Sequence, residues 1–208
     1  FATSTFWQSV GMTLVVAGQG FALAIAVGVP TGILIGWSRV LGYATRIPLE
    51  FLKPIPTIVI MPSVILVLGP TSDMAIFLIF YGCVMPIIYQ TATGVKEVDP
   101  VAVETGRSYG MGRAEILYRI VFPSASAFIG TALRIAMPTA LIVAVVAGLL
   151  GGGPGLGRDI FLAMGAGQYD YLYALVVVLG FLGLAVQFLE HRVERWLLHW
   201  HTSYRTGV

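Results

Sequence analysis

The segment ETGRSYGMGRAEILYRIVFP, residues 104–123, interrupts a chain that is otherwise poor in charge. It carries five charged side chains, Glu104, Arg107, Arg113, Glu115 and Arg119. Just before it, Asp99 and Pro100 form a typical helix start, because Asp caps free backbone N–H groups and Pro is tolerated at the first helical position. The pattern predicts one short helix over 100–109 that stops at Gly110.

A second short helix is expected to begin near Gly112 and run to Phe122, before Pro123 opens a new apolar segment. On this helix the apolar residues Leu117, Ile120 and Val121 share one face, while Glu115 and Arg119 form a favourable pair four residues apart. The segment therefore predicts two short helices joined by a glycine hinge. An amphipathic linker resting on lipid headgroups is the alternative.

The rest of the chain has the composition of a membrane protein. Of 208 residues, 57% are hydrophobic and 11% are charged, against about 25% charged in soluble domains. The mean hydropathy is +0.88. Five charge-free stretches are long enough to hold the roughly 20 apolar residues of a membrane helix. We therefore expect an all-α, polytopic membrane protein forming a single domain over 1–208, with spans near 10–37, 51–69, 74–95, 124–149 and 171–190.

The positive charges are unevenly divided between the two sides of this predicted topology. If the 96–123 segment is cytoplasmic, that side also holds most other cations, namely Arg39, Arg46, Lys53, Lys96, Arg107, Arg113, Arg119, Arg192, Arg195 and Arg205. The opposite side keeps only Arg158, and Arg134 lies within a span. Because positive residues favour the cytoplasmic side, we expect an outer N-terminus for this fragment and a cytoplasmic C-terminus.

Glycines and prolines predict how the spans pack. The first span has many glycines, which let helix backbones approach closely in lipid. The second contains Pro54, Pro56, Pro62 and Pro70, so we expect a kinked or broken helix, as common in elements that line a solute path. The outer loop 148–170 is glycine-rich and predicts a short surface helix around 157–165.

Several other features carry less functional information. The chain begins with Phe1 rather than Met, so we expect a truncated N-terminus. The lone Cys83 lies within a span and is expected to pack there. The C-terminal stretch looks like an interfacial tail with Trp196 and Trp200 at headgroup level. Its histidines, His191, His199 and His201, lack a carboxylate cage, so no metal site is expected.

The charged segment resembles the cytoplasmic loop of bacterial binding-protein-dependent ABC importer permeases. That loop has the pattern Glu-Ala-Ala, three residues, Gly, nine residues, Ile, one residue, Leu-Pro. This chain has Glu104-Thr105-Gly106, then Gly110, then Ile120 and Phe122-Pro123 at the same spacing. The stretches LEFLKPIPTIVIMP, VDPVAVETGRSYG, ALRIA (132–136) and GPGLG (153–157) are similar to the nitrate, sulfonate and taurine branch. That branch often has a Glu where this chain has Gly148.

The resemblance implies the type I importer fold in a bacterial inner membrane and a docking role for the charged segment. Such permeases dock this segment into a cleft of a cytosolic ATPase subunit. Gly110 would allow the sharp turn, Glu104 would pair with a basic group of the ATPase, and Tyr109 and Met111 would offer apolar contact. Thr105 and Gly106 complete the predicted coupling site.

The expected partners follow from the same resemblance. They are two copies of the ATPase, a second permease copy, an extracytoplasmic solute-binding protein and lipid, with no nucleic acid. The sequence contains no G-x-x-x-x-G-K-[ST] phosphate loop, so ATP and Mg²⁺ are expected on the partner chain and no cofactor on this one. Neither a zinc-hydrolase motif nor a catalytic triad is present, which argues for transport rather than catalysis.

Arg134 is the basis for predicting a small anionic solute. Candidates are a sulfonate, taurine, nitrate or another organic anion. Arg134 lies eleven residues past Pro123, about 16 Å into the bilayer, where a charge is costly without a partner. No acidic residue is expected at the same depth. The alternative is an Arg134 that binds carbonyls or water and locks helices together. The other candidate pathway residues are Thr139, Gln90, Thr91, Thr93, Thr57 and Ser63.

A stand-alone secondary transporter or channel is the alternative function. Such proteins couple to ions through acidic residues buried in the membrane. The ten Asp and Glu residues of this chain are all expected at span ends or in loops, which favours the importer permease.

Overall fold

The computed structural model describes residues 4–197, with side chains described as far as Arg192. Within this range the chain is helical throughout its regular structure and contains no strand, as predicted. The elements are α1 (Ser4–Trp37), α2 (Arg39–Leu52), α3 (Thr57–Leu68), α4 (Ser72–Lys96), α5 (Pro100–Ser108), α6 (Arg113–Ile116), a π-helical turn (Leu117–Val121), α7 (Phe122–Gly151), α8 (Leu156–Gly165) and α9 (Tyr169–Leu197).

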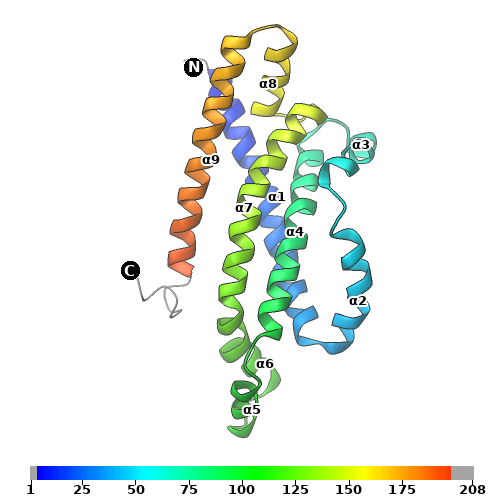
Figure 1. The fold of residues 1–208 in the computed structure, drawn as a ribbon, viewed down its shortest axis with the longest axis vertical. Coiled ribbons are helices and arrows are strands. Elements are labelled where there is room, and N and C mark those ends of the chain that lie inside the picture. Colours follow the sequence, from blue (N-terminus) through cyan, green and yellow to red (C-terminus); the bar gives the residue numbers. More distant parts are fainter. Residues whose placement is uncertain (1–3, 198–208) are drawn as a thin grey trace.

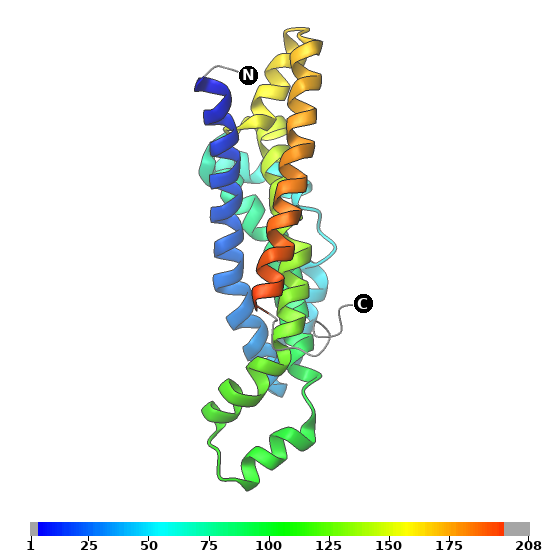
Figure 2. The same ribbon diagram turned by 90° about the vertical axis from the view of Figure 1, so that its left-hand side faces the viewer.

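The long helices α1, α4 and α7 run side by side and form the centre of the molecule (Figures 1 and 2). Helices α5 and α6 form a hairpin at one end, and α8 lies at the other. We call these the hairpin end and the α8 end. Among the described residues, four segments are long and apolar enough to cross a membrane, and a fifth is obtained if α2 and α3 are taken as one broken span.

A stripe of small residues on α1 fits directly against α4. Gly20, Gly28, Gly32 and Gly36 lie four or eight residues apart, with Ala24 completing the stripe. A Cβ added at any of these glycines would lie only 2.6–2.7 Å from a side-chain atom of α4. The expected close approach of backbones is therefore confirmed. It matters because helices in lipid associate through packing rather than through the hydrophobic effect.

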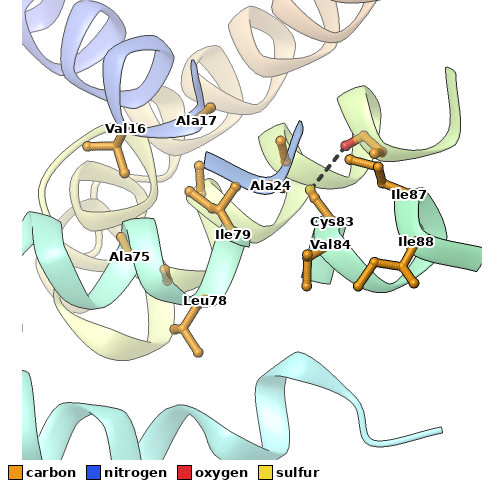
Figure 3. Close-up of a cluster of buried hydrophobic side chains, with 14 of the residues drawn as sticks. Val16, Ala17, Ala24, Ala75, Leu78, Ile79, Cys83, Val84, Ile87 and Ile88 are labelled. Carbon is orange, nitrogen blue, oxygen red and sulfur yellow. Dashed lines mark hydrogen bonds between the residues drawn. The ribbon is translucent and has the colours of Figure 1, made fainter. Parts of the chain in front are cut away.

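The other face of α4 packs against small residues of α7. Ala132, Ala136 and Ala140 are at most 3% exposed and share a core with α1 and α4. Cys83 is fully buried in this core, and its thiol donates a hydrogen bond of 3.3 Å to the Ala136 carbonyl (Figure 3). Cys83 is thus a packing residue, as the sequence indicated.

The predicted second span differs from the structure. Instead of one helix over 51–69, two helices, α2 and α3, meet at an angle of 88°. Helix α2 already begins at Arg39, with the Ser38 side chain accepting from the Leu41 N–H. The break falls where Pro54 and Pro56 interrupt the helical hydrogen bonds, so the expected breakage is confirmed but its bounds were wrong.

The earlier start of α2 changes the position of Lys53. The Leu52 carbonyl accepts a 3.2 Å hydrogen bond from the Tyr81 hydroxyl, and Lys53 Nζ lies 4.6 Å from the centre of the Tyr89 ring. Tyr89 precedes Lys96 by seven residues, about 11 Å along α4. Lys53 therefore lies about two helical turns from Lys96 along α4, with an exposed side chain, instead of level with the hairpin end. The side of the membrane to which it belongs stays a prediction.

The short helix predicted around 157–165 is present as α8, but its first turn is buried. Leu156 has no exposed surface, and its N–H donates a 2.9 Å hydrogen bond to Thr13 Oγ1 of α1. A Cβ at Gly157 would collide with the Val145 carbonyl of α7, and one at Gly148 would lie 3.0 Å from the Arg158 nitrogen. The glycine at position 148 therefore makes room for α8.

Of the predicted tail, Trp200, His199, His201 and Arg205 lie outside the described residues. Arg195 and Trp196 belong to the last turns of α9, but their side chains are not described. Within the described part, no group of three or more His, Cys, Asp or Glu side chains is arranged to hold a metal ion.

Candidate functional site

Helix α5 of the hairpin begins and ends with well-defined caps. Asp99 Oδ1 accepts a 2.8 Å hydrogen bond from the Val101 N–H, as the sequence indicated. At the other end Gly110 has φ +79°, and two reversed hydrogen bonds join Met111 N–H to Gly106 O (3.0 Å) and Gly110 N–H to Arg107 O (2.9 Å). This is a Schellman motif, whose left-handed residue is usually glycine. It gives Gly110 a specific structural role in the turn.

Gly106 is the point where the two arms of the hairpin touch. It is buried, and an added Cβ would lie 2.7 Å from Ile120 Cδ1 and 3.4 Å from Met111 Sδ. Ile116, Val121 and Met111 belong to a small apolar cluster that also includes Val95 and Val98. The hairpin therefore has a core of its own, and Met111 packs partly into it rather than lying fully on the outside.

The remaining predicted coupling residues lie on the outer surface of the hairpin. Glu104 and Thr105 are exposed, and Tyr109 is 81% exposed at the tip. The Thr105 hydroxyl donates to the Val101 carbonyl within α5. The expected pair between Arg119 and Glu115 is present at 3.3 Å on the second arm. The arrangement offers an acidic and an aromatic contact at a protruding turn.

The hairpin is connected to the membrane core without a break in helical structure. Helix α6 continues through the π-helical turn Leu117–Val121 directly into α7. Figure 2 shows this arm leading from the hairpin into the bundle. On that side, one continuous helical segment therefore joins the hairpin to α7.

Two of the predicted pathway residues come together on one face of the bundle. A Cβ added at Gly82 of α4 would lie 3.0 Å from Thr57 Oγ1 of α3 and 3.9 Å from Thr139 Cγ2 of α7. Both threonines are half-buried. Thr57 and Thr139 thus form a polar spot at the bend of the broken span, where three helices meet.

The other predicted pathway residues are dispersed. Thr93 is exposed and lines a groove between α2 and α4. Thr91 is fully buried against Gly32 of α1, and its hydroxyl has no hydrogen-bond partner. Ser63 is exposed on α3, and Gln90 is half-buried on α4. Of the four, Thr93 is therefore the one that faces an open groove.

Arg134 has an acidic partner, so the prediction that none lies at its depth was wrong. Arg134 Nε is 3.0 Å from Glu190 Oε1 of α9, and the Glu190 side chain is 7% exposed. The depths match because α8 leads outward for ten residues, about 15 Å, before α9 turns back (Figure 1). Glu190, expected at a span end, thus reaches Arg134. The pair joins α7 to α9 and matches the charge of Arg134. Arg134 therefore no longer argues for an anionic solute as an unpaired charge within a span.

The groove beside Thr93 is lined by charged residues. From the sequence, its cations were assigned to the cytoplasmic side but not to a groove. Its volume is about 600 Å³, and Arg39, Arg46 and Glu50 of α2 line one wall, with Tyr89 and Lys96 of α4 on the other. The signal that was available is the spacing of Arg39, Arg46 and Lys53, seven residues apart, which places three cations on one face of a helix. The predicted spans 10–37 and 51–69 assign no helix to the residues between them, so this spacing was not used.

Comparisons with known proteins identify the class to which this fold belongs. Residues 28–199 match the family model described as "Binding-protein-dependent transport system inner membrane component". The chain belongs to this family and is an ABC importer permease subunit with membrane-spanning helices.

Two named relatives show the branch to which the chain is similar. The bicarbonate transport system permease protein CmpB of Synechococcus elongatus is 31% identical over 196 residues, which cover 94% of this chain and 69% of the relative. The taurine transport system permease protein TauC of Escherichia coli is 26% identical over 204 residues, covering 97% and 73%.

Solved structures support the fold independently. A chain of the MetNI methionine ABC transporter in an inward-facing conformation has a TM-score of 0.80, with 93% of this chain and 96% of that chain covered. The sequence identity is 20%, so this likeness concerns the fold alone. The predicted type I importer architecture is therefore confirmed.

Proposed function

We propose that this chain forms the solute pathway of an ATP-driven importer of a small anion and that it docks to a cytosolic ATPase through the α5–α6 hairpin. The observation that carries the coupling role is the geometry of the hairpin. It is a protruding turn with its own apolar core, with Glu104 and Tyr109 on its surface and with a continuous helical connection to α7. ATPase closure would move α7 through this connection and so alternate the access to the pathway.

An anionic solute is supported by the relatives rather than by Arg134. The two named relatives carry bicarbonate and taurine transport in their names, and both solutes contain an anionic group. The exact solute of this chain, whether a sulfonate, taurine, nitrate, bicarbonate or another organic anion, is set by a solute-binding protein that delivers it.

The pathway is proposed to form between two copies of the chain. The open face at Thr57 and Thr139 is formed by half-buried polar side chains, which are unfavourable against lipid and favourable beside an aqueous path. A second copy opposite this face would enclose the path. The chain itself performs no chemistry, because ATP and Mg²⁺ belong to the ATPase in this proposal.

The coupling role is tested with the permease and its ATPase purified together and placed in proteoliposomes. Glu104→Lys is expected to weaken ATPase binding and abolish stimulated ATP hydrolysis, because it reverses the charge on the docking surface. Asp170→Lys is the matched control, since Asp170 is also exposed but lies at the α8 end. Full stimulation by the Glu104→Lys complex would contradict the docking assignment.

The orientation in a bacterial inner membrane is tested by labelling from each side. Cys83→Ser provides the background, because a serine can donate the same hydrogen bond to Ala136. A thiol at the exposed Ser108 is expected to react only from the cytoplasm, and one at the exposed Gln168 only from outside. The reverse pattern would overturn the proposed topology, including a cytoplasmic C-terminus.

A further inference from the structure

The cations of α2 lie on a face distinct from its apolar face. Arg39, Arg46 and Lys53 follow each other at intervals of seven residues, which on a helix leaves them within about 40° of one another. Val40 and Ile47 are each one residue further along, about 100° around the helix. They are more than 75% exposed and do not line the groove, whereas Arg39 and Arg46 do.

The cationic face of α2 is directed at α4 across the groove. Lys96 of α4 adds a positive charge to the opposite wall, and Glu50, which is bound to Arg46 at 3.0 Å, is the carboxylate among the lining residues. The groove walls therefore carry three cations and one carboxylate. Lys53 continues the series further along α4, away from the hairpin end, where its ammonium lies over the ring of Tyr89, itself a lining residue.

Lys53 is the informative member because of its depth. A lysine within a bilayer is unfavourable unless its ammonium reaches water or a partner. Lys53 forms no ion pair within 4 Å among the side chains that the structure describes, and it is exposed. The Tyr89 ring supplies a cation–π contact but no counter-charge. Such a lysine is stable in a water-filled groove, and there it attracts an anion.

We infer that Arg39, Arg46, Lys53 and Lys96 form an anion-binding groove that receives the solute on the inner half of its path, with Lys53 as the innermost anion contact. This inference rests on the proposed function. The ligand is a small oxyanion such as a sulfonate or a carboxylate. Lipid headgroup phosphates share this chemistry, but the exposed apolar stripe of Val40 and Ile47, not the cationic face, is suited to the lipid side.

The inference is tested with a charged thiol probe, which requires no knowledge of the natural solute. A cysteine replaces the groove residue Thr93 in the Cys83→Ser background of the complex with its ATPase, reconstituted in phosphatidylcholine. The measured quantity is the ratio of modification rates by sulfonatoethyl methanethiosulfonate, an anion, and the trimethylammonium analogue, a cation. Lys53→Gln is expected to lower this ratio about fourfold. One charge about 10 Å away at the dielectric of water changes each rate about twofold, and it does so in opposite directions for the anionic and the cationic probe.

Two control variants separate the groove charge from other effects. Lys53→Arg keeps the charge and is expected to keep the ratio. Arg192→Gln removes a cation that likewise lies over an aromatic ring, that of Phe188 at 4.9 Å, but on α9, and it is expected to leave the ratio unchanged. An unreactive Thr93→Cys thiol, or a ratio that Lys53→Gln does not change, would overturn the inference.

Lipid composition distinguishes the two sources of anion. The effect of Lys53→Gln is expected in phosphatidylcholine alone; an effect that appears only with phosphatidylglycerol would assign the cations to headgroups and overturn the pathway assignment. ATP hydrolysis by the same complexes reports separately on the proposed function. Normal stimulation with an unchanged ratio would refute the groove and leave the importer assignment intact.

Discussion

The two ends of the molecule use the same local motif for different purposes. At the hairpin end, α5 stops in a Schellman motif with Gly110 at φ +79°; at the α8 end, α8 stops in the same motif with Gly167 at φ +67°. The bonds correspond, since Gln168 N–H donates to Ala163 O at 2.9 Å and Gly167 N–H to Met164 O at 3.2 Å. No neighbouring atom lies within 4 Å of a Cβ added at either glycine.

The difference between the ends lies in what the preceding helix contacts. Helix α8 is fixed to the core by the buried bond between Leu156 and Thr13 and by the close approach of Gly157 to α7. Helix α5 contacts mainly the other arm of its own hairpin, and its outer surface remains exposed. The same turn thus closes a fixed scaffold at one end and presents a contact surface at the other. Long-range contacts of the preceding helix, not the turn itself, decide whether an end is a fixed scaffold or an exposed contact surface.

The largest effect is expected for Gly157→Ala. The added methyl would meet the Val145 carbonyl, a backbone atom that cannot move away cheaply. We expect a loss of about 3 kcal/mol, the upper end of over-packing costs, measured as a lower midpoint of unfolding in detergent. Gly106→Ala is the matched change in the hairpin, where the obstacle is the flexible tip of Ile120. Equal losses in the two variants would show that α8 is not more tightly fixed than α5.

The next largest effect is expected for Thr13→Val. Removing the hydroxyl leaves the buried Leu156 N–H without an acceptor, which costs about 1–3 kcal/mol. Thr105→Val removes a hydroxyl from the exposed surface of α5 and should change stability by less than about 0.5 kcal/mol. Hydrogen exchange of the α8 amides measures the difference. Unchanged protection in Thr13→Val would show that this bond does not hold α8 in place.

Gly110→Ala and Gly167→Ala are expected to have similar effects on stability but different effects on function. Each places a side chain in the left-handed region, at a cost of about 1 kcal/mol. Only Gly110→Ala should reduce stimulation of the ATPase, because only its turn belongs to the proposed docking surface. If Gly167→Ala reduced stimulation equally, loss of stability rather than a change in the docking surface would explain both.

The smallest effect is expected for Glu115→Gln. This change breaks the surface pair with Arg119, whose side chain is 64% exposed, and such pairs contribute about 0.3–0.5 kcal/mol. The unfolding midpoint should therefore shift only slightly, and less in high salt. A large loss would show that the pair is shielded and that the second arm is more buried than this structure indicates.

Features governed by neighbouring residues were predictable from the sequence. The Asp99 cap, the turn at Gly110, the Glu115–Arg119 pair and the glycine stripe of α1 all follow from spacing within one helix or turn. The break near Pro56 was also predictable, because proline removes a hydrogen-bond donor. The coupling residues and the solute remain predictions.

The sequence by itself determined an all-helical membrane chain with a charged two-helix hairpin, because hydrophobic length and capping act locally. Only the tertiary structure decided that Glu190 meets Arg134 and that Lys53 lies over the ring of Tyr89 on α4. Both depend on how far one helix is shifted along another. That shift is set by the length and docking of α8 and by the early start of α2. It cannot be predicted from the residue spacing within a single span.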